Sequence, residues 1–199
     1  MILFVAAMKE EVKLFYDQET ENVKVLLTGI GKVNAAMVLA DFLAKNQVEA
    51  IYNLGFAGAT EPYDVGDLVL IKEAMYHDFD LTVFGHEKGQ VPGFPALFLS
   101  DDSLMKQIES QFQSIKTGRL LTGDYFMTKK QEKSCILDME GAALYHVAYK
   151  NNIPIVSVKI VSDVMGMTDH YQSYKKFEAQ IGAELLHNVF KILVKEVSK

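Results

Sequence analysis

The chain has 199 residues, of which 49% are hydrophobic and 23% are charged, a composition typical of one globular domain spanning 1–199. Its formal net charge of −6, with no basic stripe, argues against binding to a nucleic-acid backbone. The single cysteine, Cys135, cannot form an internal disulfide, and no apolar run approaches the ~20 residues of a membrane span. We therefore expect a cytoplasmic protein with neither a nucleic-acid nor a membrane partner.

The first quarter of the chain alternates predicted strands with predicted helices. Residues 2–7 are apolar, as in a buried strand, and residues 9–15 follow as a short helix that begins with acids. A second strand is predicted over 23–27. Residues 32–46 carry apolar side chains on one helical face, which predicts an amphipathic helix, and 50–54 reads as a third strand.

The middle of the chain is less regular. Residues 68–71 continue the predicted sheet. The stretch 77–95 is rich in loops, because it holds several glycines and two of the four prolines. A helix is predicted over 103–112, with Ser103 as its cap. Two short strands are predicted at 120–121 and 136–137.

The last third returns to alternation, with a helix at 140–150, an apolar strand at 155–161 and a final helix at 174–197. Strands that alternate with helices predict an α/β protein whose sheet is mostly parallel and covered on both faces. The loop-rich stretch indicates that some strand pairing is antiparallel, so we expect a mixed sheet.

Three acids follow predicted strands in the same way. Glu11 comes after the first apolar strand, Glu140 opens a helix after a short strand, and Asp163 follows the strand at 155–161. Side chains just past the carboxyl ends of parallel strands face the ligand crevice of such a sheet. None of these acids has metal-ligand spacing around it. Their convergence predicts acid/base chemistry on an uncharged polar substrate, whereas each acid alone is equally typical of a helix start or a turn.

Other motifs leave alternatives open. The Gly29-Ile30-Gly31-Lys32 turn lacks the first glycine and the Ser or Thr of a phosphate-binding P-loop. It is either a receptor for a polar group through its backbone N–H groups or only a tight strand-to-helix turn. The cluster around His77 and Asp78 is more typical of a hydrogen-bonded loop than of a metal site, so we expect no metal and no cofactor. Phe126 either stacks on a base or packs a corner.

Several short motifs occur in order along the chain. They are Ala7-Met8-Lys9-Glu10-Glu11, Gly29-Ile30-Gly31-Lys32, Gly55-Phe56-Ala57-Gly58, Val65-Gly66-Asp67, Tyr76-His77-Asp78, the stretch 85–93, Gly123-Asp124, Asp138-Met139-Glu140-Gly141-Ala142 and Val161-Ser162-Asp163. In this order they resemble the bacterial 5′-methylthioadenosine/S-adenosylhomocysteine nucleosidases of the purine nucleoside phosphorylase superfamily. The resemblance covers nearly the whole chain. It implies a three-layer α/β/α sandwich with a central mixed, mostly parallel twisted sheet, a homodimer, and hydrolysis of an adenine N-glycosidic bond in a small nucleoside.

The resemblance also implies roles for four polar residues. Asp163 matches the acid that protonates the leaving purine, and Ser162 matches the residue that supports this acid. Glu11 matches the base that activates water. Glu140 matches the carboxylate that holds the ribose hydroxyls.

Further residues match the family's binding positions. Met139 matches a residue beneath the ribose, and Phe126 the aromatic ring stacked on adenine. Met127 matches a backbone contact to the base. Met8 and Ile30 match the lining of the ribose and alkylthio pocket.

Four more positions concern the edges of the matched site. Phe84 and Pro92 match positions that the family lends to the neighbouring subunit's site. Phe56 and Lys159 depart from the family, which has a serine and an arginine there, near the attacking water. An aromatic residue of the last helix that closes the family's site falls near Tyr174.

The residues leave three alternatives to this nucleosidase. A phosphorylase of the same superfamily would need a cluster of basic residues around the glycine turns, where the chain offers only Lys32 and Lys159. A nucleoside-binding protein without catalysis is suggested by Phe56 and by shortened loops. A third alternative is another nucleoside substrate of the futalosine type, because divergent loops build the 5′ pocket.

Overall fold

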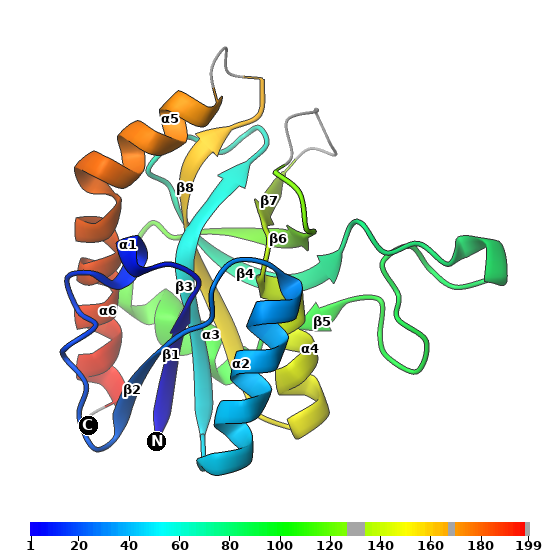
Figure 1. Ribbon diagram of the computed structural model, residues 1–199. Helices are drawn as coiled ribbons and strands as arrows, with labels where there is room; N and C mark the ends of the chain where they lie inside the picture. The colour runs from blue at the N-terminus through cyan, green and yellow to red at the C-terminus, as the bar shows by residue number, and fades with distance from the viewer. Residues whose placement is uncertain (127–133, 167–169, 198–199) are drawn as a thin grey trace.

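A computed structural model describes residues 1–126, 134–166 and 170–197, in which helices and strands alternate up to residue 59 and less regularly after it (Figure 1). The strands are β1 (Ile2–Ala6), β2 (Val23–Leu27), β3 (Ala50–Ala59), β4 (Leu68–Tyr76), β5 (Phe98–Leu99), β6 (Lys116–Thr122), β7 (Cys135–Asp138) and β8 (Ile155–Val164). The helices are α1 (Lys9–Val12), α2 (Lys32–Lys45), α3 (Asp102–Gln111), α4 (Gly141–Asn151), α5 (His170–Phe177) and α6 (Ala183–Val197). A 3₁₀ turn, η1, covers Thr82–Phe84, and a π-helical turn, η2, covers Glu178–Gly182.

The sheet is mixed, as predicted. Strand β1 lies between β2 and β3 and is parallel to both. Strand β8 runs parallel to β3 and antiparallel to β4, β6 runs parallel to β4 and β7, and β7 pairs antiparallel with the end of β3. Five strands, β3, β8, β4, β6 and β7, therefore close into a ring.

The three-layer sandwich with a single twisted sheet is not confirmed, because the sheet curls back on itself. Strand β3 makes this closure, since it pairs with β8 along its length and with β7 through Gly58 and Ala59. Its pairing with β8 shifts register between Ala57 and Gly58. Irregularities of this kind bend a strand and increase its twist, and sequence patterning carries little trace of them.

Helices cover the strands on two sides (Figure 1). Helices α2 and α4 pack on one side, where Leu39 and Leu144 are fully buried. Helices α3 and α6 pack on the other side, where Ile108 and Phe190 are buried with Phe15. The apolar periodicity of the sequence predicted these buried faces, and the two cores hold the carboxyl ends of β1, β3 and β8 at one edge.

Several element boundaries differ from the prediction. Strand β3 was predicted to end at residue 54 because the glycines that follow are typical of turns, but it continues to Ala59. Strands β4 and β6 are also longer, α1 is shorter, and α3 is capped by Asp101 rather than by Ser103. The last helical segment begins at His170 and contains the π-helical turn, which apolar periodicity does not reveal.

Candidate active site

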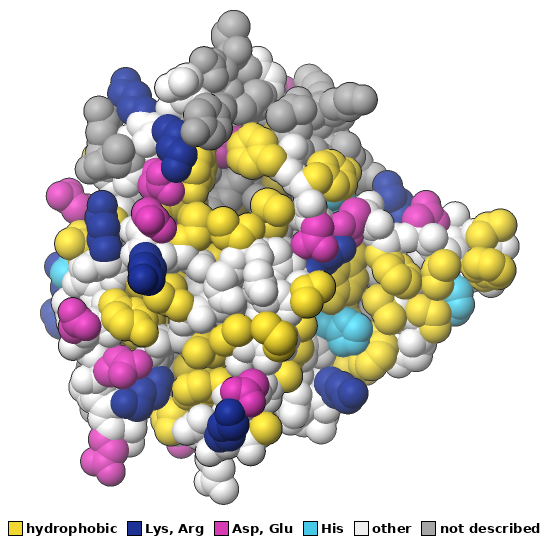
Figure 2. All heavy atoms as spheres, viewed as in Figure 1, with side chains coloured by type: hydrophobic (Ala, Val, Ile, Leu, Met, Phe, Trp, Pro, Cys, Tyr) yellow, Lys and Arg dark blue, Asp and Glu magenta, His cyan; other side chains and the backbone are white. Residues whose placement is uncertain are grey.

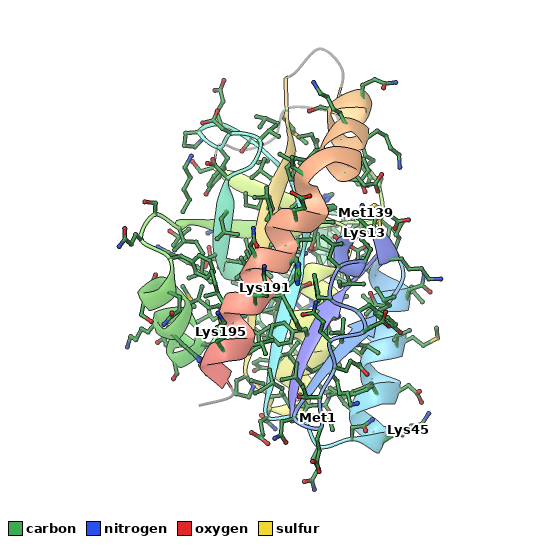
Figure 3. The ribbon with its side chains drawn as sticks, turned by 90° about the vertical axis from the view of Figure 1, so that its left-hand side faces the viewer. Met1, Lys13, Lys45, Met139, Lys191 and Lys195 are labelled. Atoms are coloured by element: carbon green, nitrogen blue, oxygen red, sulfur yellow. The ribbon has the colours of Figure 1, made fainter. Side chains whose placement is uncertain are left out.

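One cavity of about 250 Å³ lies at the carboxyl ends of β1, β3 and β8. Its lining residues are Ala7, Met8, Glu11, Ile30, Phe56, Ala57, Gly58, Phe126, Leu137, Asp138, Met139, Glu140, Ser162, Asp163 and Tyr174. Figure 3 shows Met139 well away from the end of the sheet where Met1 and Lys45 lie. The structure thus brings the three predicted acids together at one cavity, from three separate segments.

Glu11 is held at the start of α1 by backbone donors. Its Oε2 accepts hydrogen bonds from the N–H groups of Ala7 and Met8 at 3.0 and 2.9 Å, and its Oε1 accepts one from Phe56 at 2.8 Å. The side chain is buried, and burial raises the pKa of Glu11, while the charge of Lys159 and the three N–H donors oppose that rise. Glu11 is therefore oriented by the main chain, and its raised pKa makes the carboxylate a better proton acceptor than an exposed glutamate.

Glu140 stands at the N-cap of α4 and reaches across to another turn. Its Oε1 accepts a hydrogen bond from the N–H of Gly31 at 2.8 Å. Burial, followed by the negative charge of Asp138, raises the pKa of Glu140 to about 7, although the bond from Gly31 opposes the rise. The carboxyl group can therefore change its charge near neutral pH.

Asp163 lies near the end of β8, where β3 approaches it closely. The hydroxyl of Ser162 lies 2.8 Å from Oδ1 of Asp163 and 3.1 Å from the carbonyl oxygen of Ala57, and can donate to either. Gly58 pairs with Asp163, and a Cβ at this glycine would lie 3.3 Å from Oδ2. The absence of a side chain at Gly58 leaves room for this buried carboxyl group at the cavity wall.

Lys159 lies beneath the acids rather than in the cavity wall. Its Nζ forms an ion pair with Oδ2 of Asp138 at 3.0 Å, and both side chains are buried. Sequence reasoning singled out Lys159 but missed Asp138. The signal that points to such an acid is a lysine within a mostly apolar, buried strand, because a buried cation requires a partner of opposite charge.

Apolar and aromatic side chains form the remaining walls. The rings of Phe126 and Tyr174 meet edge to face with centroids 6.5 Å apart. The hydroxyl of Tyr174 donates to Oε1 of Glu178 at 3.0 Å and also lies 3.5 Å from Sδ of Met8. Half of the Phe126 and Ile30 surfaces is exposed, so these two residues stand at the mouth.

Phe84 and Pro92 do not line this cavity. Phe84 is 75% exposed in the projecting segment between β4 and β5, and Pro92 lies in the same segment. Met127 falls outside the described residues. The individual roles expected for the site residues therefore stay predictions, whereas their proximity around one cavity is observed.

A polar network joins the turns beside the cavity. The Lys32 ammonium contacts both carboxylate oxygens of Asp78 at 2.6 Å, and the backbone N–H of Lys32 donates to Oδ1 of Asp124 at 2.9 Å. The N–H of Asp124 in turn donates to Asp78 at 2.9 Å. Within residues 1–126, 134–166 and 170–197, no group of three or more His, Cys, Asp or Glu side chains is arranged to hold a metal ion.

The helices of the described residues are α1 to α6. None of those helices combines the length and the apolar character that crossing a bilayer demands.

Comparisons with known proteins point in one direction. Residues 8–195 match the model of the phosphorylase superfamily. A 5′-methylthioadenosine/S-adenosylhomocysteine nucleosidase from Geobacillus sp. is 32% identical, over 98% of this chain and 99% of that protein. Among solved structures, the same nucleosidase from Neisseria meningitidis, in complex with methylthio-immucillin-A, has a TM-score of 0.88 at 26% identity and covers 98% of both chains. The Streptococcus pneumoniae nucleosidase with the transition-state inhibitor MT-ImmA has a TM-score of 0.86 at 28% identity, over 98% of both chains.

Proposed function

Because this chain belongs to the 5′-methylthioadenosine/S-adenosylhomocysteine nucleosidases of the phosphorylase superfamily, we propose that its cavity hydrolyses the adenine N-glycosidic bond of these nucleosides. The chain is thus an N-glycosyl hydrolase that releases adenine and a 5-thioribose product. The observation that supports a working site is the placement of Glu11, Glu140 and Asp163 around one cavity.

Asp163 is the proposed general acid. Adenine is a poor leaving group as an anion and a better one when its imidazole ring receives a proton, so the C1′–N9 bond breaks more easily once an acid donates. Asp163 is buried, and burial disfavours the charged form of a carboxyl group. The hydroxyl of Ser162, 2.8 Å from Oδ1, orients the carboxyl group for the transfer.

Glu11 is the proposed general base. In the reaction, a water oxygen bonds to C1′ of the ribose, its proton passes to the Glu11 carboxylate, and the electrons of the C1′–N9 bond leave with the protonated adenine. This division between one acid and one base is that of an inverting glycoside hydrolase. Nearby carboxylates stabilise the positive charge that develops on the sugar, and Glu140 is placed to bind the ribose hydroxyls.

The apolar walls fit the remaining parts of the substrate. Phe126 offers its ring to the purine, and Met139 lies beneath the ribose in this arrangement. Met8, Ile30 and Tyr174 line the part of the cavity that would receive an alkylthio group. Burial against apolar side chains stabilises a bound alkylthio group, which needs no charged partner.

We further propose that the chain acts as a homodimer. Apolar side chains are exposed on α2, where Val33 is 74% and Met37 60% exposed, and on the projecting segment, where Val83 and Phe84 are 83% and 75% exposed. Figure 2 shows apolar side chains on this face of the molecule, from the region of α2 to the tip of the projection. Contiguous exposed apolar surface is typical of protein interfaces, and a second copy is the partner that would bring Phe84 and Pro92 to a site.

The alternative of a phosphorylase is disfavoured by charge. A phosphate nucleophile would have to approach Glu11, which repels it. The buried cation beside Glu11, Lys159, already forms an ion pair with Asp138.

The test is incubation of the purified protein with methylthioadenosine, with and without phosphate, followed by chromatographic measurement of adenine. Equal adenine release in both samples supports the nucleosidase. Release only with phosphate would indicate the phosphorylase. Stabilisation by adenosine analogues without any release would indicate a binding protein.

A further inference from the structure

Burying the ion pair between Lys159 and Asp138 costs free energy, so stability alone does not explain the pair. Nζ of Lys159 lies 3.0 Å from Oδ2 of Asp138, and the two side chains are 4% and 2% exposed. Removing two charges from water costs several kcal/mol, so such a pair contributes little to stability on its own. Asp138 also lines the cavity, which places the pair at the reaction site.

Asp138 is itself fixed by neighbours from two elements. The hydroxyl of Thr122 donates to its Oδ1 at 2.6 Å, and the N–H of Gly141 lies 3.1 and 3.0 Å from its two carboxylate oxygens. Thr122 is held in turn, because its Oγ1 accepts a hydrogen bond from the N–H of Ala142 at 2.9 Å. Asp138 is therefore a rigid anchor for the cation.

The anchored cation lies beside Glu11. Gly55 pairs with Lys159 across β3 and β8, and a Cβ at this glycine would lie 2.7 Å from Oε1 of Glu11 and 3.3 Å from Nζ of Lys159. Oε1 of Glu11 and Nζ of Lys159 therefore both lie close to Gly55, in space that is open because this residue has no side chain. A longer residue at Gly55 would displace one or both of them.

Three carboxylates act on the Lys159 ammonium, and one tyrosine acts on Glu11. Asp138 of β7, Glu11 of α1 and Glu140 before α4 act on Lys159, and Tyr174 of α5 faces Glu11. Burial alone would lower the pKa of Lys159, but the carboxylates, Asp138 first, hold the pKa above its ordinary value. The Lys159 side chain is therefore a cation. Its position among the three acids determines which of them it stabilises in the ionised form.

We propose that Asp138 is a positioning residue of the hydrolysis, which holds the Lys159 ammonium beside Glu11 without letting it bind the Glu11 carboxylate. The cation then favours the ionised form of Glu11, and the carboxylate stays free to take the proton of the attacking water. This inference rests on the proposed function, and it adds a residue that acts through Lys159 and not by touching the substrate.

The test compares the pH dependence of kcat/KM for methylthioadenosine in Asp138→Asn, Lys159→Met and the double variant, each made in a Glu140→Gln background, because the charge of Asp138 also raises the pKa of Glu140. In Asp138→Asn, Lys159 turns to Glu11, so the acid limb moves to lower pH by about one unit and kcat falls by at least about tenfold. In Lys159→Met the limb moves to higher pH, because Glu11 loses its cation. The double variant should reproduce the limb of Lys159→Met, since Asp138 has nothing left to position.

Two outcomes would overturn the inference. One is an acid limb of Asp138→Asn that stays at the position found in the Glu140→Gln background alone, which would leave Asp138 a purely structural role. The other is a shift on adding Asp138→Asn to Lys159→Met, which would mean that Asp138 acts on Glu11 without Lys159. If Asp138→Asn does not fold by circular dichroism, Asp138→Glu replaces it, because its longer side chain moves the cation and must also move the limb.

A matched control is Glu73→Gln, which removes a carboxylate from the partly exposed Arg119 ion pair outside the cavity. Its pH profile should coincide with that of the wild type. A wild-type protein that releases no adenine at any pH would overturn the proposed function, and this inference with it. An active wild type with unmoved limbs in the variants would overturn only the inference about Asp138.

Discussion

The backbone N–H of Gly31 donates a hydrogen bond of 2.8 Å to Oε1 of Glu140, which stands 109 positions further along the chain. Gly31 has a φ of 96°, a conformation that favours glycine, and it caps α2. The glycine turn was open to two interpretations, a receptor for an anion or a tight connection. In the structure the turn connects β2 to α2, and its Gly31 N–H donates to a carboxylate of the protein itself. This hydrogen bond links the start of α2 to the start of α4 at the cavity.

The first prediction concerns the charge of Glu140. Its pKa is about 7 in the folded protein, against an ordinary value of 4.5. Between these values the unfolded chain loses the proton while the folded protein keeps it, so folding stability falls as pH rises from about 4.5 to about 7. Glu140→Gln keeps an acceptor for Gly31 but removes this cost. The variant should therefore gain roughly 1–3 kcal/mol relative to the wild type between pH 4.5 and pH 8.

Urea unfolding at the two pH values measures this difference. The same variant should release adenine at least about 100-fold more slowly, because a neutral amide stabilises the positive sugar less than a carboxylate does. A stability difference that stays constant between pH 4.5 and pH 8 would contradict the raised pKa of Glu140.

The second prediction concerns proton donation. Asp163→Asn should lower adenine release about 10³-fold or more, because an amide cannot supply the proton that the leaving purine needs. Binding of a non-hydrolysable adenosine analogue, measured by calorimetry, should change little. Substantial residual turnover in this variant would reject Asp163 as the acid.

The third prediction separates Ser162 from an ordinary buried serine. Ser162→Ala should slow adenine release by about tenfold, because the Asp163 carboxyl group loses the hydroxyl 2.8 Å from its Oδ1. Ser157→Ala is the matched control, since Ser157 is a buried serine of the same strand whose hydroxyl accepts from Asn53 instead. Equal effects of the two variants on kcat would contradict a role for Ser162 in orienting the acid.

Periodicity predicted most of the helices and strands, because their burial repeats at helical or strand spacing. The convergence of Glu11, Glu140 and Asp163 was predictable as well, since parallel strands that end at one edge place the next residues together. Neither argument depends on long-range detail. Both follow from local pattern and the geometry of a parallel sheet.

The closure of the sheet and the role of Asp138 were not predictable in this way. Closure depends on a register shift at Gly58 and on two residues of pairing between β3 and β7. Asp138 lies at the end of a four-residue strand, and its partner Lys159 is on another strand. Pairings between distant segments are set by tertiary packing, which the sequence pattern of either segment does not encode.

The fourth prediction concerns Phe56, where the related nucleosidases are expected to have serine. Its ring meets that of Phe177 edge to face at 5.3 Å, and a Cβ at Gly182 would lie 2.6 Å from its Cζ. Gly182→Ala should therefore destabilise the protein by about 1–3 kcal/mol. In a Phe56→Leu background the same substitution should cost less, because the shorter side chain leaves room. A double-mutant cycle by urea unfolding measures the coupling, and additive effects would show that the two residues do not compete for space.

The last prediction concerns the proposed dimer. Val33→Glu places a charge on the exposed apolar face of α2, so a dimer that buries this face should dissociate in sedimentation-velocity experiments. Adenine release should fall with it, because Phe84 of the projecting segment would no longer reach a neighbouring site. Ile181→Glu is the control, since Ile181 is 48% exposed on η2, on the opposite side of the strands from α2. If Val33→Glu stays dimeric, the dimer does not depend on this face of α2. If its monomer is as active as the wild type, the shared site is wrong, because a complete site would then exist within one chain.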